Sequence, residues 1–196
     1  LRILSLPNAA GVRAAMKDAA QALPPGAIVL DTTTSDPATS RDMATMGATS
    51  GWTFLDAPVS GGPTGARSGM MTMLIGGDET ALNSVRSTLE RLSATIVHVG
   101  GPGAGHAAKV ANNMLCAANL SLVAEATKMA AAAGVAPEKL MEAVNAGSGR
   151  SGVSEVNFPR WVLSQTFDSG FTMGLMRKDV ALGAALAAET GVETPA

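Results

Sequence analysis

The sequence predicts an α/β fold, in which a partial, doubly wound and mostly parallel sheet is followed by an all-α domain. Between Leu1 and about Gly100, short β-rich runs alternate with amphipathic stretches, a pattern typical of βαβ units. After Gly105, about ninety residues pass with hardly a β-branched run. The glycine-rich segment VGGPGAG (99–105) lies between these parts and indicates a hinge before a long helix. We therefore expect domains at 1–100 and 101–196.

Five runs are expected to form the strands. Each is rich in Val, Ile, Leu or Thr and is bounded by Gly, Pro, Asp or Ser. They are RILSL (2–6), AIVLD (27–31), TFLDA (53–57), TMLIGG (72–77) and TIVHVG (95–100). Three intervening stretches, 8–23, 36–51 and 78–92, are expected to be helices; in the last of these, apolar residues recur close to a 3.6-residue period.

The second half predicts three helices. The first runs from about 106 to 133 and ends at Gly134, with a proline just beyond. The next begins at Pro137 and stops near NAGSGRSG (145–152), which is too rich in glycine for a helix. The third runs from about 172 to 189.

Composition excludes several classes of partner. The formal net charge is −2, and no run of Lys or Arg could follow a phosphate backbone, so nucleic acid is not expected. No apolar stretch reaches the length of about eighteen residues that a membrane span needs. His98 and His106 lack Cys or acidic partners at ligand spacing, so no metal is expected, and His106 is predicted to be a surface or capping residue. We expect a cytoplasmic protein, with the mitochondrial matrix as the alternative.

The segment GAGHAAKVANN (103–113) allows two interpretations. A G-x-G motif between a strand and a helix resembles a dinucleotide-binding loop. That loop also requires a second strand ending in an acidic residue about twenty positions on. Glu125 has roughly this spacing but lies within a continuous helical pattern. The sequence therefore favours a catalytic helix over a phosphate cradle.

Lys109 and Asn113 are four residues apart, so they share one face of the expected helix, with Asn112 beside them. The positive end of the helix dipole disfavours a charge on Lys109, and partial burial adds to this effect. Both effects favour the neutral amine and hence general acid/base catalysis. The alternative is a solvated surface lysine.

The segment DAPVSGG (56–62) directly follows an expected strand. Ser60 supplies a hydroxyl, and Gly61 and Gly62 supply bare backbone N–H groups. Open α/β sheets bind ligands at the carboxyl ends of their strands, and this set of donors suits a carboxylate. The alternative is an ordinary turn.

Three segments together resemble the β-hydroxyacid dehydrogenases: DAPVSGG, GPGAGHAAKVANN (101–113) and GFTMGLMRKDV (170–180). That family includes 3-hydroxyisobutyrate dehydrogenase, tartronate semialdehyde reductase and glyoxylate/succinic semialdehyde reductase. The resemblance extends through nearly the whole chain in order. The G-x-G-x-x-x-K-x-x-x-N helix is specific to this family and to its 6-phosphogluconate dehydrogenase relatives.

The resemblance implies a Rossmann-type domain and hydride transfer between NAD or NADP and a small β-hydroxy acid or its semialdehyde. It implies that Lys109 is the catalytic general acid/base, with Asn113 as its catalytic partner, and that Asp179 supports the helix of Lys178. The implied substrate-binding residues are Ser60, Gly61, Gly62 and Asn112, and the implied cofactor-binding residues are Leu6, Pro7, Asn8, Thr34 and Lys178. By itself, the Lys178–Asp179 pair is more typical of a solvated helix face.

The chain also departs from the family pattern. Family members begin with a strand and a G-x-G-x-x-G loop that binds the pyrophosphate, and they continue into further C-terminal helices. This chain begins at LRILSLP and ends at GVETPA, so we expect a fragment of a longer homo-oligomer, a dimer or tetramer. A catalytically inert fragment or binding module of the same fold is the alternative. A decarboxylating, phosphogluconate-type enzyme is less favoured because no basic cluster for a sugar phosphate is present. Arg150 is a further candidate for contact with the substrate carboxylate.

Overall fold

A computed structural model describes residues 1–194, which divide into two compact units. The first unit comprises Leu1–Ala111 together with Ala181–Glu193, and the second comprises Asn112–Val180 together with Thr194. Helices α5 (Ala104–Ala132) and α7 (Met173–Thr190) each contribute residues to both units.

The first unit contains one six-stranded sheet with the order β1-β2-β3-β5-β4, in which β6 also pairs with β5. All five predicted strands are present, and β4 is an addition that was not predicted. The strands are β1 (Arg2–Leu4), β2 (Ile28–Asp31), β3 (Thr53–Asp56), β4 (Val59–Ser60), β5 (Thr72–Gly76) and β6 (Thr95–Gly100).

The sheet is mixed rather than uniformly parallel. Strands β1, β2 and β3 are parallel to one another, as are β5 and β6, whereas β5 is antiparallel to β3 and β4. Between β4 and β5 the chain forms only the seven-residue helix α3 (Gly62–Ser68). A parallel crossover needs a dozen or more residues, so the chain turns back and pairs antiparallel.

The three predicted helices of the first unit are confirmed as α1 (Ala9–Ala19), α2 (Pro37–Ser50) and α4 (Glu79–Leu89). The 3₁₀ turn η1 (Ala20–Ala22) extends α1. Each helix begins after an Asn or Asp whose side chain accepts a hydrogen bond from a backbone N–H of the first turn: Asn8, Asp36 and Asp78. These caps satisfy donors that have no partner inside the helix.

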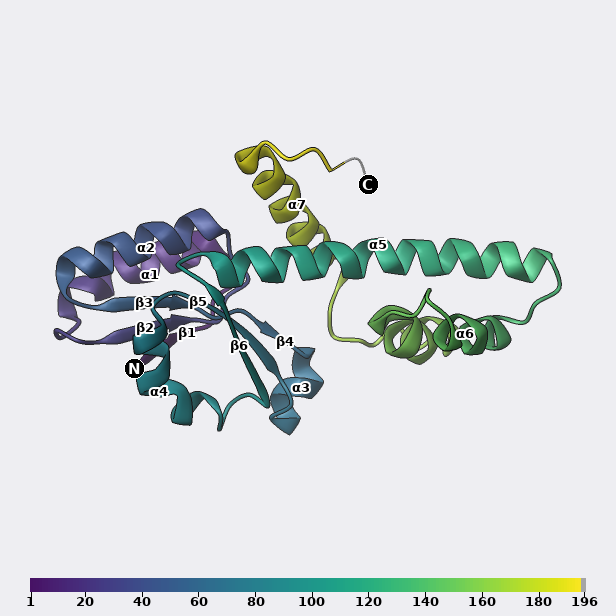
Figure 1. Ribbon diagram of the computed structural model, residues 1–196, viewed down its shortest axis with the longest axis horizontal. Helices are drawn as coiled ribbons and strands as arrows, with labels where there is room; N and C mark the ends of the chain where they lie inside the picture. The colour runs from purple at the N-terminus through teal and green to yellow at the C-terminus, as the bar shows by residue number, and fades with distance from the viewer. Residues whose placement is uncertain (195–196) are drawn as a thin grey trace. The chain divides into compact units, whose positions relative to one another are not determined.

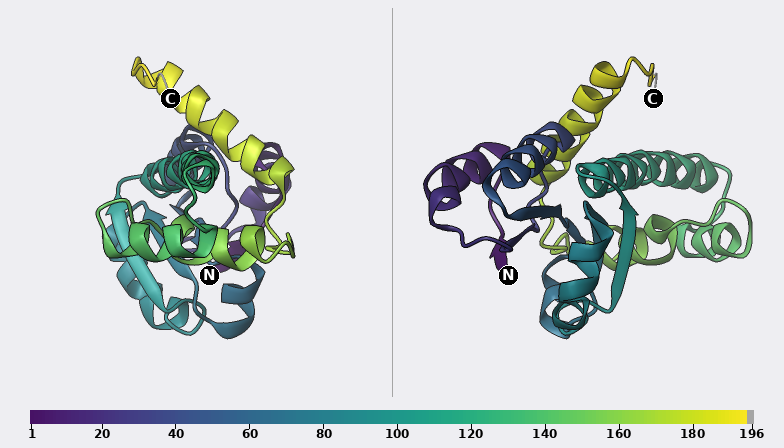
Figure 2. Two further views of the ribbon diagram at one scale, coloured as in Figure 1. Left: turned by 90° about the vertical axis from the view of Figure 1, so that its right-hand side faces the viewer. Right: turned by 60° about the vertical axis from the view of Figure 1, so that its left-hand side comes forward.

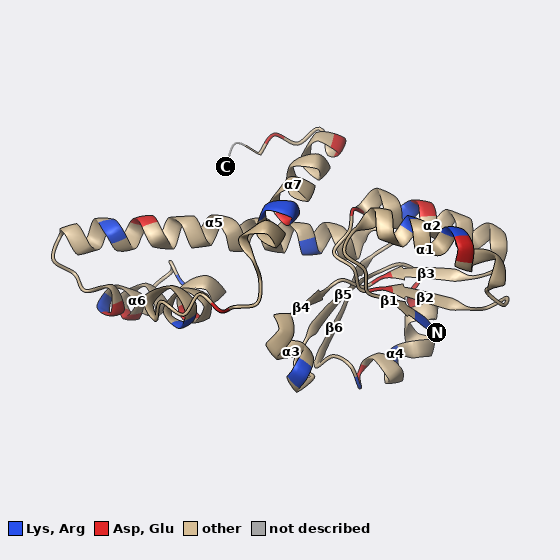
Figure 3. Ribbon diagram, turned by 180° about the vertical axis from the view of Figure 1, so that it is seen from behind, with Lys and Arg blue, Asp and Glu red and all other residues tan. Residues whose placement is uncertain are grey.

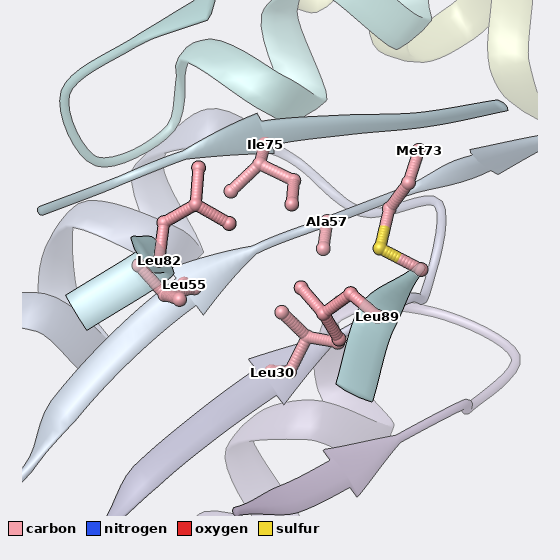
Figure 4. Packing of buried hydrophobic residues seen from close by; sticks show 7 residues of the cluster. All are labelled: Leu30, Leu55, Ala57, Met73, Ile75, Leu82 and Leu89. Carbon is pink, nitrogen blue, oxygen red and sulfur yellow. The ribbon is translucent and has the colours of Figure 1, made fainter. Parts of the chain in front are cut away.

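The central strands β2 and β3 are buried on both faces, because α1 and α2 cover one side of the sheet and α4 covers the other (Figure 1). Successive side chains alternate between the faces. Leu30 and Leu55 pack in the cluster that includes Leu82 and Leu89 of α4 (Figure 4). Their neighbours in sequence pack on the other face with α1 and α2, in the cluster Val12, Met16, Val29, Met43, Trp52 and Phe54.

The second half is helical, as predicted. Helices α5, α6 (Pro137–Ala146) and α7 match the three expected ones. The π-helix η2 (Val153–Leu163), which contains Pro159, was not predicted. Figure 2 shows α6 and η2 beside the C-terminal part of α5, where Val123, Met141, Val153 and Phe158 form a core. Within residues 1–194, no helix combines the length and apolar character that crossing a bilayer requires.

Candidate active site

In the first unit, β1, β2 and β3 are parallel, so their carboxyl ends meet at one edge of the sheet. Two of the loops at this edge are hydrogen-bonded to each other. The backbone N–H of Leu6, after β1, donates to Oγ1 of Thr33, after β2, at 3.0 Å. The Thr32 hydroxyl donates to the Leu4 carbonyl at 2.7 Å. The residues expected to bind cofactor after β1 and β2 are therefore brought together.

These cofactor candidates differ in their surroundings. Pro7 is exposed, and Leu6 and Thr34 are half-buried. The Asn8 side-chain oxygen accepts the Gly11 N–H at 3.0 Å and so caps α1. The Asn8 side chain thus has a structural role as a helix cap, which was not predicted from the sequence.

Ser60 is the last residue of β4, Gly62 is the first residue of α3, and Gly61 lies between them. Ser60 is half-buried, and both glycines are exposed. Gly61 has φ of 125° and Gly62 has φ of 60°, which other residues rarely adopt. The turn therefore depends on this glycine pair, and it presents the Ser60 hydroxyl beside backbone that carries no side chains.

The two glycines of the G-x-G motif allow the start of α5 to pack closely against strand β5 and helix α2. A Cβ on Gly105 would lie 2.5 Å from the Leu74 carbonyl oxygen, and one on Gly103 would lie 2.8 Å from the Pro37 carbonyl oxygen. After them, α5 continues without interruption to Ala132, and Glu125 is an exposed residue within it. No second strand follows within this segment, so the phosphate-cradle interpretation is wrong.

Asp56, at the end of β3, caps α5. Its carboxylate is fully buried and accepts the Gly103 N–H at 2.7 Å and the His106 N–H at 2.9 Å. His106 is also fully buried, so the prediction of a surface or capping histidine was wrong: its backbone N–H is capped by Asp56, and its ring lies inside the protein. Sequence periodicity could not reveal either contact, because the partners are about fifty positions apart.

Lys109 lies in the second turn of α5 and is 7% exposed. It is therefore not a solvated surface lysine. Its neighbours on the helix, Ala107 and Ala108, are small and half-buried. Figure 3 shows how few charged residues α5 carries; besides Lys109 there are only Glu125 and Lys128 in its 29 residues.

The second unit brings four of the predicted residues together. Asn113, one helical turn after position 109, is 8% exposed, and its Nδ2 donates to Oδ2 of Asp179 at 2.5 Å. Asn112 Nδ2 donates to Asn113 Oδ1 at 3.0 Å. Lys178 Nζ lies 3.2 Å from Asp179 Oδ1, and Asp179 is 2% exposed. This buried arrangement is not the solvated helix face that the Lys178–Asp179 pair suggests alone.

Two further charged residues have local environments of their own. Burial raises the pKa of Asp31, against the lowering effect of its hydrogen bonds from Thr33 and of the nearby His106. Arg150 is exposed, and its Nε lies 3.6 Å from Oε1 of Glu155. Arg150 thus has an acidic neighbour in its own unit.

Comparison with known proteins places the two halves in related families. Residues 2–100 match the model described as the NAD binding domain of 6-phosphogluconate dehydrogenase. Residues 103–196 match the model described as NAD-binding of NADP-dependent 3-hydroxyisobutyrate dehydrogenase. A probable 3-hydroxyisobutyrate dehydrogenase of Mycobacterium tuberculosis H37Rv is 33% identical over 98% of this chain and 68% of its own length. The chain belongs to the 3-hydroxyisobutyrate dehydrogenase family.

Other members of the 3-hydroxyisobutyrate dehydrogenase family extend the comparison. The 2-(hydroxymethyl)glutarate dehydrogenase of Eubacterium barkeri is 34% identical over 97% of this chain and 64% of its own length. The solved Mycobacterium tuberculosis 3-hydroxyisobutyrate dehydrogenase with L-serine superposes with a TM-score of 0.93, covering 98% of this chain and 68% of that one. The chain thus spans about two thirds of the length of these relatives.

Proposed function

We propose that the complete polypeptide encoded by the gene is an NAD(P)-dependent dehydrogenase of a small β-hydroxy acid or the corresponding semialdehyde. The observation that carries this proposal is the buried Lys109, one turn before the buried Asn113 on α5. The names of the relatives support the substrate class, because they act on 3-hydroxyisobutyrate or 2-(hydroxymethyl)glutarate. Each name describes a carboxylic acid whose hydroxyl group is on the carbon β to the carboxylate.

The loops after β1 and β2 suit a nicotinamide cofactor. They supply backbone amides, the exposed ring of Pro7 and the half-buried Leu6 and Thr34 at the carboxyl edge of parallel strands. Asp36, which caps α2, is the one charged side chain in these two loops, at positions 5–8 and 32–36. When bound, the cofactor supplies the hydride acceptor or donor. Lys178 is a further proposed cofactor-binding residue, on the basis of the family resemblance.

Lys109 acts as the general acid/base in this proposal. In the oxidation direction, its neutral amine accepts the proton of the substrate hydroxyl. In the reduction direction, its ammonium returns a proton to the carbonyl oxygen, so the same Nζ serves both directions. The burial of Lys109 supports this role because it keeps the proton transfer away from bulk water.

The remaining polar groups position the substrate. The Ser60 hydroxyl and the backbone N–H groups of Gly61 and Gly62 are neutral donors suited to a carboxylate. Asn113 is oriented by Asp179 and Asn112, and it holds the substrate oxygen and the amine of Lys109 in register. Asn112 is exposed and contributes through its contact with Asn113.

Replacing Lys109 tests the proposal. In the complete polypeptide, we expect Lys109→Ala to lower kcat by at least about 10²-fold, the usual contribution of a general acid/base. Lys128→Ala is the matched control, because Lys128 lies on the same helix but is exposed. The assay follows NADH and NADPH absorbance with 3-hydroxyisobutyrate, L-serine and tartronate semialdehyde.

Near-normal kcat in Lys109→Ala would contradict the assignment of the general acid/base. Titration of the purified 196-residue chain with NADH and NADPH, read by fluorescence, separates an inert fragment from one that still binds cofactor. Absence of turnover in the wild-type complete polypeptide with every acid, despite cofactor binding, would favour the binding-module alternative.

A further inference from the structure

Three fully buried side chains of the first unit have no part in the proton and hydride chemistry: Asp56, His106 and Ser40. They lie where the loop after β2 meets the first turn of α5. We infer that His106 is a positioning residue that fixes the cofactor-side loops relative to the helix segment that carries Lys109. This inference rests on the proposed function and assigns a role that the sequence motifs do not.

The His106 ring joins two elements to α5. Its Nε2 lies 2.7 Å from the Thr33 carbonyl oxygen, and its Nδ1 lies 2.7 Å from Ser40 Oγ in α2. A carbonyl oxygen only accepts hydrogen bonds, so Nε2 carries a proton. In the neutral ring, Nδ1 therefore accepts from the Ser40 hydroxyl, and both ring nitrogens have a partner.

The position of the ring is itself fixed through the backbone. Asp56 accepts the N–H groups of Gly103 and His106 and thereby holds the first turn of α5 to the end of β3. A carboxylate at a helix N-terminus also interacts favourably with the helix dipole. The His106 side chain consequently starts from an anchored backbone, three residues before Lys109.

From Thr33, hydrogen bonds lead on to both loops. The Thr33 N–H donates to Asp31 Oδ1 at 3.0 Å, and its Oγ1 accepts the Leu6 N–H at 3.0 Å. The carbonyl that His106 binds thus belongs to the residue that connects the loop after β2 with the loop after β1. A shift of this residue would move Leu6 and Thr34 relative to Lys109.

The test compares variants of the complete polypeptide. His106→Leu removes both ring contacts, and His106→Gln keeps an amide that can donate to the Thr33 carbonyl. Ser40→Ala removes only the Nδ1 contact, which provides a milder change if His106→Leu fails to fold. The control is His98→Gln, at the chain's other histidine, whose Nε2 contacts the Gly77 carbonyl on a different strand pair.

We expect His106→Leu to raise KM for NADH or NADPH and to lower kcat, each by roughly ten- to a hundredfold, because small displacements of reacting groups are costly. His106→Gln should recover a substantial part of the lost cofactor affinity and turnover. Ser40→Ala should give KM and kcat values between those of the two His106 variants, and His98→Gln should match the wild type. Unchanged KM and kcat in folded His106→Leu or, should it fail to fold, in Ser40→Ala would overturn the inference. The inference would also be overturned if His106→Leu lost stability and His106→Gln did not recover KM and kcat.

Amide hydrogen exchange separates this inference from the proposed function. The Leu6 and Thr33 amides should exchange faster in His106→Leu, or in Ser40→Ala, than in His98→Gln, whether or not the protein oxidises any acid tested. If the wild type is inactive but these amides respond, the proposed function is wrong and the positioning contact stands. If they do not respond, the positioning role is refuted directly.

Discussion

Asp179 holds Asn113 through a hydrogen bond between two side chains that are both more than nine-tenths buried. A hydrogen bond to a charged group contributes about 1.5 to 3 kcal/mol, and the contact is less screened by solvent than a surface pair. Asp179→Ala leaves the Asn113 amide buried without this acceptor, and Asn113→Ala leaves the buried carboxylate without this donor. Each single change removes the same contact.

A double-mutant cycle measures this contact. We expect the free energy of unfolding of the 196-residue chain, from urea titration, to show a coupling energy of about 1.5 to 3 kcal/mol between the two positions. In the complete polypeptide, Asp179→Ala should also lower kcat by about tenfold or more, because Asn113 loses its orientation. Asp179→Asn retains an acceptor oxygen and should lose less. Additive effects to within about 0.5 kcal/mol would refute this account of Asn113.

Two further expectations concern pH and assembly. Burial raises the folded-state pKa of Asp31 above its ordinary value of 3.8, so its stabilising contribution is present below about pH 3.8 and is lost as pH rises through the raised pKa. Asp31→Asn should therefore gain stability relative to the wild type between pH 4 and pH 7 in urea titrations, and parallel pH profiles would count against this. We also propose that the complete polypeptide is a homo-oligomer, in which a second copy covers the exposed apolar stripe Leu115, Leu122 and Met129 on α5. Sedimentation equilibrium should give a smaller mass for Leu122→Glu than for Ser121→Glu, and equal masses would argue against this surface.

The parts of the fold that depend on local pattern could be predicted from the sequence. The stretches that begin at Asn8, Asp36 and Asp78 were predicted to be helices, and in the structure each of these three residues caps the helix that follows. The additional strand β4 could not be predicted, because two residues carry no periodicity and only the pairing with β5 defines them. Helix η2 was not predicted either. A proline inside a helix is unfavourable, and η2 is stabilised by the packing of Val153 and Phe158 against α5 and α6.

The candidate site divides in the same way. Lys109 and Asn113 are four apart on one helix, so their shared face follows from spacing alone. Their burial does not, because it depends on segments far away in the sequence. The bond from Asn113 to Asp179 spans 66 positions, and the bond from the His106 ring to the Thr33 carbonyl spans 73. Residues that react can therefore be found in a local motif, whereas residues that hold them in place are found only once distant segments are seen in contact.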